Sequence, residues 1–109
     1  MIEFSNIEII TTTPDQITAD RMAQALLEER LAACIQVSGP VSSHYRWEGL
    51  NRHDQEWICT IKTNCDLFTT VSRRIQELHP YDNPQIIALP IIMLSEKYQQ
   101  WLESGISVK

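Results

Sequence analysis

The segment Val41–Thr63, "VSSHYRWEGLNRHDQEWICTIKT", decides the fold. Apolar or small side chains alternate with polar ones up to Trp47, and the alternation resumes at Trp57. Successive strand residues face opposite sides of a sheet, so both parts are predicted to be strands. Gly49 and Asn51 lie between them and can take the positive φ of a tight turn. The segment therefore predicts a long antiparallel hairpin, and at about 3.3 Å per residue its arms should project from so small a domain.

The residues at the start of the chain predict a buried strand that leads into a helix. Ile7–Thr13 is rich in β-branched residues and ends before Pro14. Thr13 as N-cap, Pro14 at the first helical position and Gln16 three residues after Thr13 form a capping box. Apolar residues then recur at three- and four-residue spacing through residues 17–33. This periodicity predicts a helix of about five turns with one apolar face.

A second strand and a second helix flank the hairpin. The strand opens at Cys34, and Gly39–Pro40 interrupts it as a β-bulge or bend would. The helix is predicted over residues 64–78, with Asn64 or Asp66 as its cap and apolar residues on one face.

The stretch "LHPYDNPQ", residues 78–85, follows that helix and predicts a corner. Each proline disfavours the helical region for the residue before it, so His79 and Asn83 should be extended. The apolar run 84–93 then predicts a buried strand, and Ser95 predicts the cap of a short C-terminal helix.

The order of these elements predicts an α+β fold. An order βαββαβ corresponds to a ferredoxin-like sandwich, here with a long β-hairpin and a short C-terminal helix, in one domain over residues 1–109. The last strand has no polar face, and alternate hairpin positions are aromatic. Two helices can cover only one face of the sheet, so a single copy would expose apolar surface. Self-association is therefore expected.

Composition excludes several classes of protein. The net charge of -5 disfavours nucleic acid as a partner, because that binding needs clustered Lys and Arg. No apolar run approaches the roughly 20 residues that span a bilayer, and the first ten residues lack a basic region, so we expect a cytoplasmic protein without membrane contact. The three cysteines form no CxxC pair, which favours buried reduced thiols.

The corner is the best candidate for a chemical site. Imidazole and carboxylate suit copper, zinc or nickel, so His79 and Asp82 are candidate metal ligands beside Tyr81. The alternative is a structural corner, in which His79 at a helix C-terminus binds the last carbonyls. "HDQE", residues 53–56, is interpreted as a solvated, edge-protecting charge cluster, and His44 as a surface strand residue. No nucleophile or phosphate-loop motif is present, so an enzyme is not expected.

Several motifs together resemble one known family. These are "ERLAACIQV", "SHYRWEGL", "IKT", "LHPYDNPQIIALPI" and "YQQWL", which occur in this order over almost the entire chain. They resemble the CutA family, the divalent-cation tolerance proteins. The resemblance implies a ferredoxin-like fold, a tight homotrimer, and a link to tolerance of copper and other divalent metals. The architecture of the family is similar to that of the trimeric nitrogen-signalling regulators, which bind small effectors between subunits. A small effector at a subunit boundary is therefore a second expected ligand.

The resemblance also implies where a site and an interface should lie. Copper, or another divalent cation that folding does not require, is expected at His79 with help from Asp82 or the thiol of Cys34. The trimer interface is expected to include four aromatic residues: Tyr45, Trp47, Tyr81 and Trp101.

Two departures from the family pattern concern the same region. Gln85 stands where the family usually has an acid, and Leu94 stands near a common glycine. Leu78 and Thr11 occupy positions where some members carry further copper ligands.

Three functions follow as hypotheses. The first is a cytoplasmic trimer that responds to divalent metal, copper first. The second is a trimeric signalling or scaffold protein that acts through protein partners without a metal ligand. The third, a hydrolase of the acylphosphatase type, would need a glycine-rich loop after the first strand, and "TTTPDQ" has no glycine.

Overall fold

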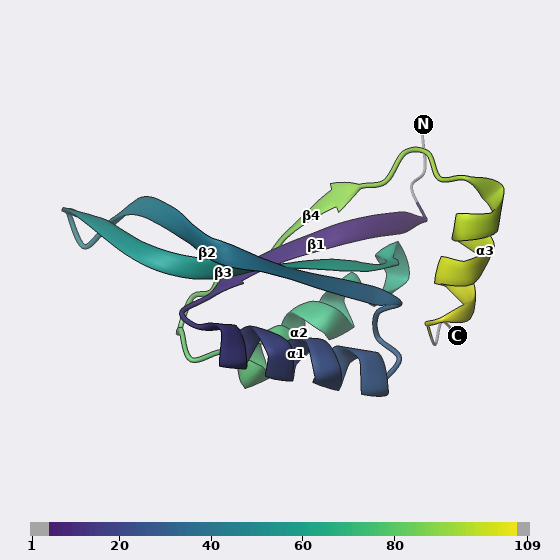
Figure 1. The fold of residues 1–109 in the computed structure, drawn as a ribbon, viewed down its shortest axis with the longest axis horizontal. Helices are drawn as coiled ribbons and strands as arrows, with labels where there is room; N and C mark the ends of the chain where they lie inside the picture. The colour runs from purple at the N-terminus through teal and green to yellow at the C-terminus, as the bar shows by residue number, and fades with distance from the viewer. Residues whose placement is uncertain (1–4, 107–109) are drawn as a thin grey trace.

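A computed structural model of the chain describes residues 5–106 and has the predicted ferredoxin-like arrangement. Four antiparallel strands form one sheet in the order β2-β3-β1-β4. Helices α1 and α2 cover one face, the β2–β3 hairpin projects beyond them, and α3 lies at the opposite end (Figure 1). The elements are β1 Asn6–Thr13, α1 Gln16–Glu28, β2 Cys34–Trp47, β3 Leu50–Asn64, the short 3-10 helix Cys65–Leu67, α2 Phe68–Leu78, β4 Ile87–Pro90 and α3 Glu96–Ser104. Residues 1–4 and 107–109, the two ends of the predicted domain, lie outside the described residues.

The cap of α1 differs from the prediction. Asp15, not Thr13, is the N-cap, and its carboxylate accepts a hydrogen bond of 2.7 Å from the Thr18 N–H. Thr13 is buried as the last residue of β1, because it still pairs with Trp57 of β3. Strand pairing thus extends the strand through the residue that the local motif assigns to the cap.

Helix α1 also ends earlier than the five predicted turns. Arg30 has a φ of 57°, and its N–H donates to the Leu27 carbonyl at 3.0 Å. The Leu31 N–H donates to the Leu26 carbonyl, also at 3.0 Å. These two bonds make a Schellman motif, which satisfies the last carbonyls and ends the helix before the apolar pattern stops.

The hairpin has the predicted bulge and a tight turn. The register of β2 against β3 shifts between Ser38 and Val41, on either side of Gly39–Pro40. A Cβ on Gly39 would lie 2.6 Å from Cδ1 of Trp57, so only glycine fits there. At the tip, Glu48 and Gly49 have φ angles of 50° and 79°, as in a type I′ turn.

One turn residue was predicted wrongly. Asn51 lies in β3, where it pairs with Arg46, and Glu48 takes the second positive φ. A two-residue type I′ turn needs positive φ at two consecutive positions, and the strand pairing places them at 48 and 49.

The core lies between the two helices and the sheet. Ile9, Leu26, Ile61 and Ile75, from four different elements, are fully buried. Cys59 is buried among them, and its burial raises the pKa of the thiol to about 11. Its predicted burial is confirmed, whereas Cys65 is exposed and Cys34 half-buried, so burial of all three thiols was wrong.

Strand β4 is much less buried than predicted. Only Ile87–Pro90 pairs with β1, and all four residues are exposed in the single chain. Ile87 is 45% and Leu89 47% exposed, because β4 is an edge strand and residues 5–106 place no layer over it. Ile92 and Met93 beyond it are exposed as well.

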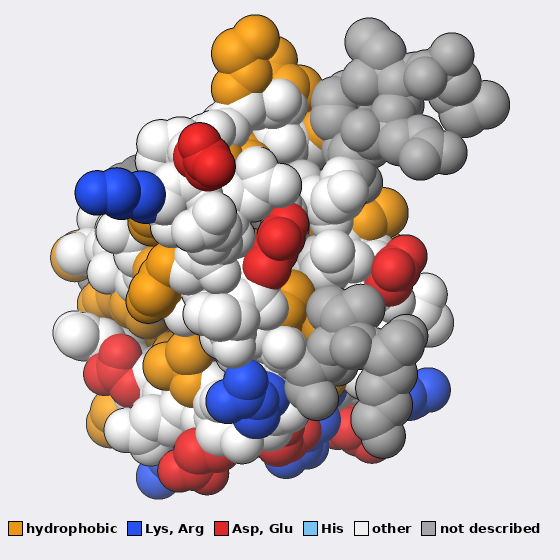
Figure 2. All heavy atoms as spheres, turned by 90° about the vertical axis from the view of Figure 1, so that its right-hand side faces the viewer, with side chains coloured by type: hydrophobic (Ala, Val, Ile, Leu, Met, Phe, Trp, Pro, Cys, Tyr) orange, Lys and Arg blue, Asp and Glu red, His pale blue; other side chains and the backbone are white. Residues whose placement is uncertain are grey.

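Helix α3 begins as predicted at Ser95, whose hydroxyl accepts from the Tyr98 N–H at 3.4 Å. Leu102 is buried against the end of the sheet, while Trp101 is half exposed. At this end of the molecule, apolar side chains reach the surface between scattered acidic and basic ones (Figure 2). None of the helices within residues 5–106 has the length and apolar character of a membrane span.

Candidate functional site

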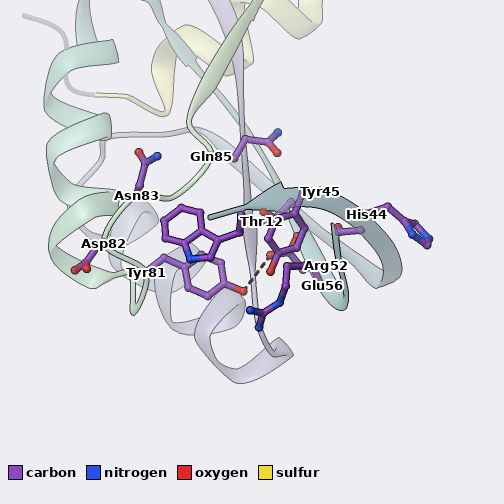
Figure 3. A pocket seen from close by; sticks show the side chains of 11 residues that line it. Thr12, His44, Tyr45, Arg52, Glu56, Tyr81, Asp82, Asn83 and Gln85 are labelled. Carbon is purple, nitrogen blue, oxygen red and sulfur yellow. Dashed lines mark hydrogen bonds between the residues drawn. The ribbon is translucent and has the colours of Figure 1, made fainter. Parts of the chain in front are cut away.

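The principal pocket lies between the hairpin and the corner that follows α2. It has a volume of about 570 Å³ and is partly open to solvent. Figure 3 shows side chains from β1, β2, β3 and the corner around it. The lining residues are Thr12, Ser43, His44, Tyr45, Trp47, Arg52, Glu56, Tyr81, Asp82, Asn83 and Gln85.

His79 ties the corner to the sheet. Its ring is buried, and Nε2 lies 2.7 Å from the carbonyl oxygen of Thr12 in β1. Nδ1 accepts a hydrogen bond of 3.1 Å from the Tyr81 N–H. A carbonyl can only accept and an amide can only donate, so these partners assign the proton to Nε2. Both ring nitrogens are therefore engaged within the chain, as the structural-corner hypothesis requires.

Extended backbone at His79 was also predicted correctly. Its φ and ψ are -88° and 138°, and α2 ends at the residue before it. Pro80 cannot continue the helix and disfavours helical geometry at His79, so the chain turns here toward β4. The corner thereby places Tyr81 and Asp82 at the pocket.

Tyr81 forms one wall of the pocket through a hydrogen bond to Glu56. The phenol donates to Oε2 of Glu56 at 3.1 Å, which Figure 3 marks as a dashed line. Partial burial, followed by this hydrogen bond and the charge of Glu56, raises the pKa of Tyr81 well above its usual range. The Tyr81 ring also contacts His79, with 4.7 Å between ring centroids. The phenol therefore stays protonated and holds a buried carboxylate in place.

A second pair of the same kind lies further along the hairpin. The Tyr45 hydroxyl donates to the carboxylate of Asp54, and this bond is the main cause that raises the pKa of Tyr45. Asp54 and Glu56 are two residues apart on β3, opposite Ser43 and Val41 of β2. Their carboxylates therefore lie on the same face of the strand. Arg52 is the one arginine or lysine among the pocket-lining side chains. The pocket thus offers carboxylate acceptors and aromatic side chains to a cation or a polar small molecule.

The three predicted metal ligands are not brought together within one chain. Asp82 lines the pocket, whereas His79 is not among the lining residues and has both ring nitrogens engaged. Cys34 pairs with Lys62, four residues along the sheet from the level of Thr12, which is about 13 Å at 3.3 Å per residue. Across residues 5–106, no group of three or more His, Cys, Asp or Glu side chains is placed to hold a metal ion. Their meeting across a boundary between two copies stays a prediction.

The four predicted interface aromatics are all partly exposed in the single chain. Tyr45, Trp47 and Tyr81 line the pocket. Trp101 lies on α3 next to Tyr98, with 5.3 Å between ring centroids. Their exposed fractions are 41% for Tyr45, 48% for Trp47, 38% for Tyr81 and 50% for Trp101. The role of these side chains in an interface stays a prediction.

The interpretation of residues 53–56 as a solvated cluster was wrong for Glu56. Its side chain is buried and accepts from Tyr81, 25 residues further along the chain. The bulge in β2 shifts the register, which places Glu56 opposite Val41 on the pocket side. The signal in the sequence was an acid directly before Trp57, where the apolar alternation resumes. His44 and His53 are exposed, so the interpretation of His44 as a surface strand residue is confirmed.

Comparison with known proteins agrees with this fold. A family model described as CutA1 divalent ion tolerance protein matches residues 7–105. The divalent-cation tolerance protein CutA of Thermus thermophilus is 40% identical over 97 residues, which are 89% of this chain and 94% of that protein. The chloroplastic protein CutA of Arabidopsis thaliana is 34% identical over 100 residues, which span 92% of this chain and 55% of the relative. The crystal structure of CutA1 from Oryza sativa matches with a TM-score of 0.94 at 32% identity and covers 97% of each chain. This chain therefore belongs to the family of CutA1 divalent ion tolerance proteins.

Proposed function

We propose that this chain forms a cytoplasmic homotrimer that takes part in the response to divalent cations, copper first, without enzymatic chemistry. Each subunit would be one domain, and a neighbouring copy would close the open side of the pocket. Copper or a small effector would bind at this boundary. The family membership supports the link to divalent cations, because the Thermus thermophilus relative is named for divalent-cation tolerance.

The incomplete pocket is the observation that carries this proposal. One side is built within the chain from a buried carboxylate and its tyrosine, Glu56 and Tyr81. The other side is open, and Tyr45 and Trp47 remain about half exposed beside it. Aromatic side chains of this kind act as anchors when a partner buries them. Exposed Ile87 and Leu89 on the sheet edge add apolar surface that a second copy would cover.

The proposal keeps the three candidate metal ligands that were predicted from the sequence. Asp82 supplies a carboxylate within the pocket. His79 would have to release one of its two hydrogen bonds, and a thiol such as Cys34 would have to come from another copy. Copper is favoured over other divalent ions of the first row for a given set of nitrogen, oxygen and sulfur ligands.

Sedimentation tests the proposed trimer, and calorimetric titration tests the proposed copper site. Sedimentation equilibrium at micromolar concentration should give three times the 12.6 kDa chain mass. Calorimetric titration with copper should show heat that Asp82→Asn reduces, while Asp66→Asn, the same change at an exposed carboxylate outside the pocket, leaves it unchanged. A monomer would overturn the assembly, and copper binding unaffected by Asp82→Asn and Cys34→Ser would overturn the site.

A second function is favoured by the state of His79. Because both of its ring nitrogens are engaged, the corner serves as a rigid support without any metal. The trimer would then act as a signalling or scaffold protein that binds other proteins. A trimer that gives no heat with copper, zinc or nucleotides would favour this alternative.

A further inference from the structure

Two histidines on the projecting hairpin face each other across the strands. His44 of β2 and His53 of β3 are direct register partners. Their ring centroids are 4.2 Å apart and their planes differ by 5°. The chain has three histidines, and the third, His79, is buried at the corner. Two of the three imidazoles are therefore stacked in contact at an exposed position.

The backbone holds this pair in a geometry that favours a shared ligand. The two-residue turn makes Trp47 and Leu50 the first hydrogen-bonded pair of the hairpin. Hydrogen-bonded and non-hydrogen-bonded pairs alternate along antiparallel strands, so the pair three rungs further on, His44 and His53, is of the non-hydrogen-bonded type. Such pairs have the closer Cα atoms, about 4.5 Å apart, and their side chains leave the sheet on the same face.

The surroundings leave the pair accessible and free of competing bonds. Both side chains are exposed, and Figure 3 shows the ring of His44, at the rim of the pocket, pointing away from Tyr81. Neighbouring rungs of this face carry Ser42 opposite Gln55 and Arg46 opposite Asn51. The Arg46 guanidinium, which donates to Asn51 at 3.5 Å, is the one charged group among these four side chains. Asp54 lies on the other face, where it accepts from Tyr45.

We propose that His44 and His53 together bind one divalent transition-metal ion, copper(II) most tightly, through one nitrogen of each imidazole. Imidazole is a preferred ligand of copper, nickel and zinc, and copper(II) forms the strongest complexes in that series. Rotation about the Cβ–Cγ bonds of two exposed side chains turns the stacked rings toward a common ion. Water occupies its remaining coordination positions. The ion links β2 to β3 and so resists fraying of the ribbon.

This site goes beyond the proposed function and shares with it only the class of ion. It lies within one chain, on the face opposite the Tyr45–Asp54 bond, and uses none of the pocket-lining carboxylates. It needs neither a trimer nor release of His79 from Thr12. Loss of the trimer, or of the Asp82-dependent heat, would overturn the proposed function and leave this site standing.

Copper titration of paired variants tests the proposal. Electron paramagnetic resonance of the full chain with one equivalent of Cu²⁺ should show two nitrogen ligands. His44→Gln and His53→Gln should each weaken copper binding by at least about tenfold, the scale on which removal of a supporting group lowers metal affinity. Gln55→Ala, on the next rung of the same face, should leave the two-nitrogen signal unchanged. An unchanged signal in the double variant His44→Gln/His53→Gln would overturn the site.

A measurement on the unmodified protein keeps the test independent of variant folding. Diethyl pyrocarbonate acylates exposed imidazoles, and mass spectrometry locates the products. Bound Cu²⁺ should protect His44 and His53 together, and a chelator should restore their modification. Copper should also raise the melting temperature of the wild type by more than that of the double variant, since an ion that binds only the folded state stabilises it. If both residues were modified as fast with saturating Cu²⁺ as without it, the proposal would be overturned.

Discussion

The same two strands, β2 and β3, pass through two regions with different surroundings. Near the helices, the β3 residues Cys59 and Ile61 are fully buried under α1 and α2. Beyond the bulge, Tyr45 and Trp47 keep about half of their surface exposed, and Leu50 keeps 64%. Both regions carry apolar side chains, but only the first has a second layer within the chain (Figure 1). Alternation along a strand therefore shows which side is apolar, and the neighbouring layer decides whether that side is buried.

Polar contacts differ between the regions in the same way. In the part covered by helices, Thr63 donates to the Leu31 carbonyl at 2.6 Å, and His79 bonds to Thr12. These bonds join segments far apart in the sequence to the backbone of the core. On the ribbon, Tyr45 bonds to Asp54, its neighbour across the hairpin. Apart from the bond between Tyr81 and Glu56, the projecting part of the β2–β3 hairpin, which we call the ribbon, is thus held mainly by its own strand pairing.

The largest expected effect is on the core. Leu26→Ala should lower the free energy of unfolding by about 2–5 kcal/mol, because a fully buried side chain leaves a cavity between α1 and the sheet. Leu27→Ala, the next residue on the same helix and 46% exposed, is the matched control and should cost much less. Urea unfolding at one fixed chain concentration measures both. Equal losses would show that the layer over the sheet is not what stabilises this region.

The next effect concerns the ribbon and its proposed partner. Trp47→Ala should weaken the trimer by roughly 2 kcal/mol, because large aromatic anchors carry much of the energy of an interface. Sedimentation velocity over a dilution series measures the dissociation. Ile17→Ala, which removes an apolar side chain that is 64% exposed on α1, should leave the assembly unchanged. If Trp47→Ala preserved the trimer at every dilution, Trp47 would contribute only to packing within its own hairpin.

An effect of similar size is expected at the long-range hydrogen bond between Tyr81 of the corner and Glu56 of the hairpin. Tyr81→Phe leaves the buried carboxylate of Glu56 without its phenol donor and should cost about 1–3 kcal/mol. Glu56→Gln retains an oxygen that can accept from Tyr81 and should cost less. Thermal unfolding of the two variants side by side gives the difference. A Tyr81→Phe protein as stable as the wild type would mean that water replaces the phenol.

The smallest effect on stability is expected at the cysteines, but the reactivity of the buried Cys59 and the exposed Cys65 should differ strongly. Cys59 is buried and its pKa is raised to about 11, whereas Cys65 is exposed. At pH 8 a thiol reagent should modify Cys65 within minutes and leave Cys59 unmodified, as mass spectrometry would show. If Cys59 reacted as fast as Cys65, Cys59 would have to be accessible at the surface.

The sign of the pH dependence follows from the same shift. The folded chain holds the Cys59 proton more tightly than the unfolded chain, whose thiol has a pKa near 8.5. This contribution to stability is therefore complete below the unfolded value and is lost as pH rises toward 11. Urea unfolding at pH 8 and pH 10, with Cys59→Ala as the control that lacks the titrating thiol, measures the loss.

Local patterns in the sequence predicted most of the fold correctly. Alternation in β2 and β3 identified the hairpin, Gly39–Pro40 identified the bulge, and Ser95 identified the start of α3. These features depend on side-chain periodicity and on the backbone preferences of single residues, which act within a few positions of the chain. The α+β order followed from the same patterns, whereas the family resemblance rested on the longer motifs quoted above.

The candidate site was predicted only in part for a physical reason. His79 and Asp82 were recognised by residue type, but the partner of each His79 nitrogen depends on contacts with β1 and the corner. Glu56 was assigned to solvent because its burial requires Tyr81, which only the folded chain brings to it.

The sequence by itself determined which segments are strands and helices and which of their sides are apolar, because these properties follow from neighbouring residues. Tertiary structure alone decided that Asp15 caps α1, that β4 lies exposed at an edge, and that two imidazoles 9 positions apart stack across the hairpin. Each of these depends on the order or the register of the strands, which are fixed by pairing over the whole sheet. A shift of one residue would turn every side chain to the other face.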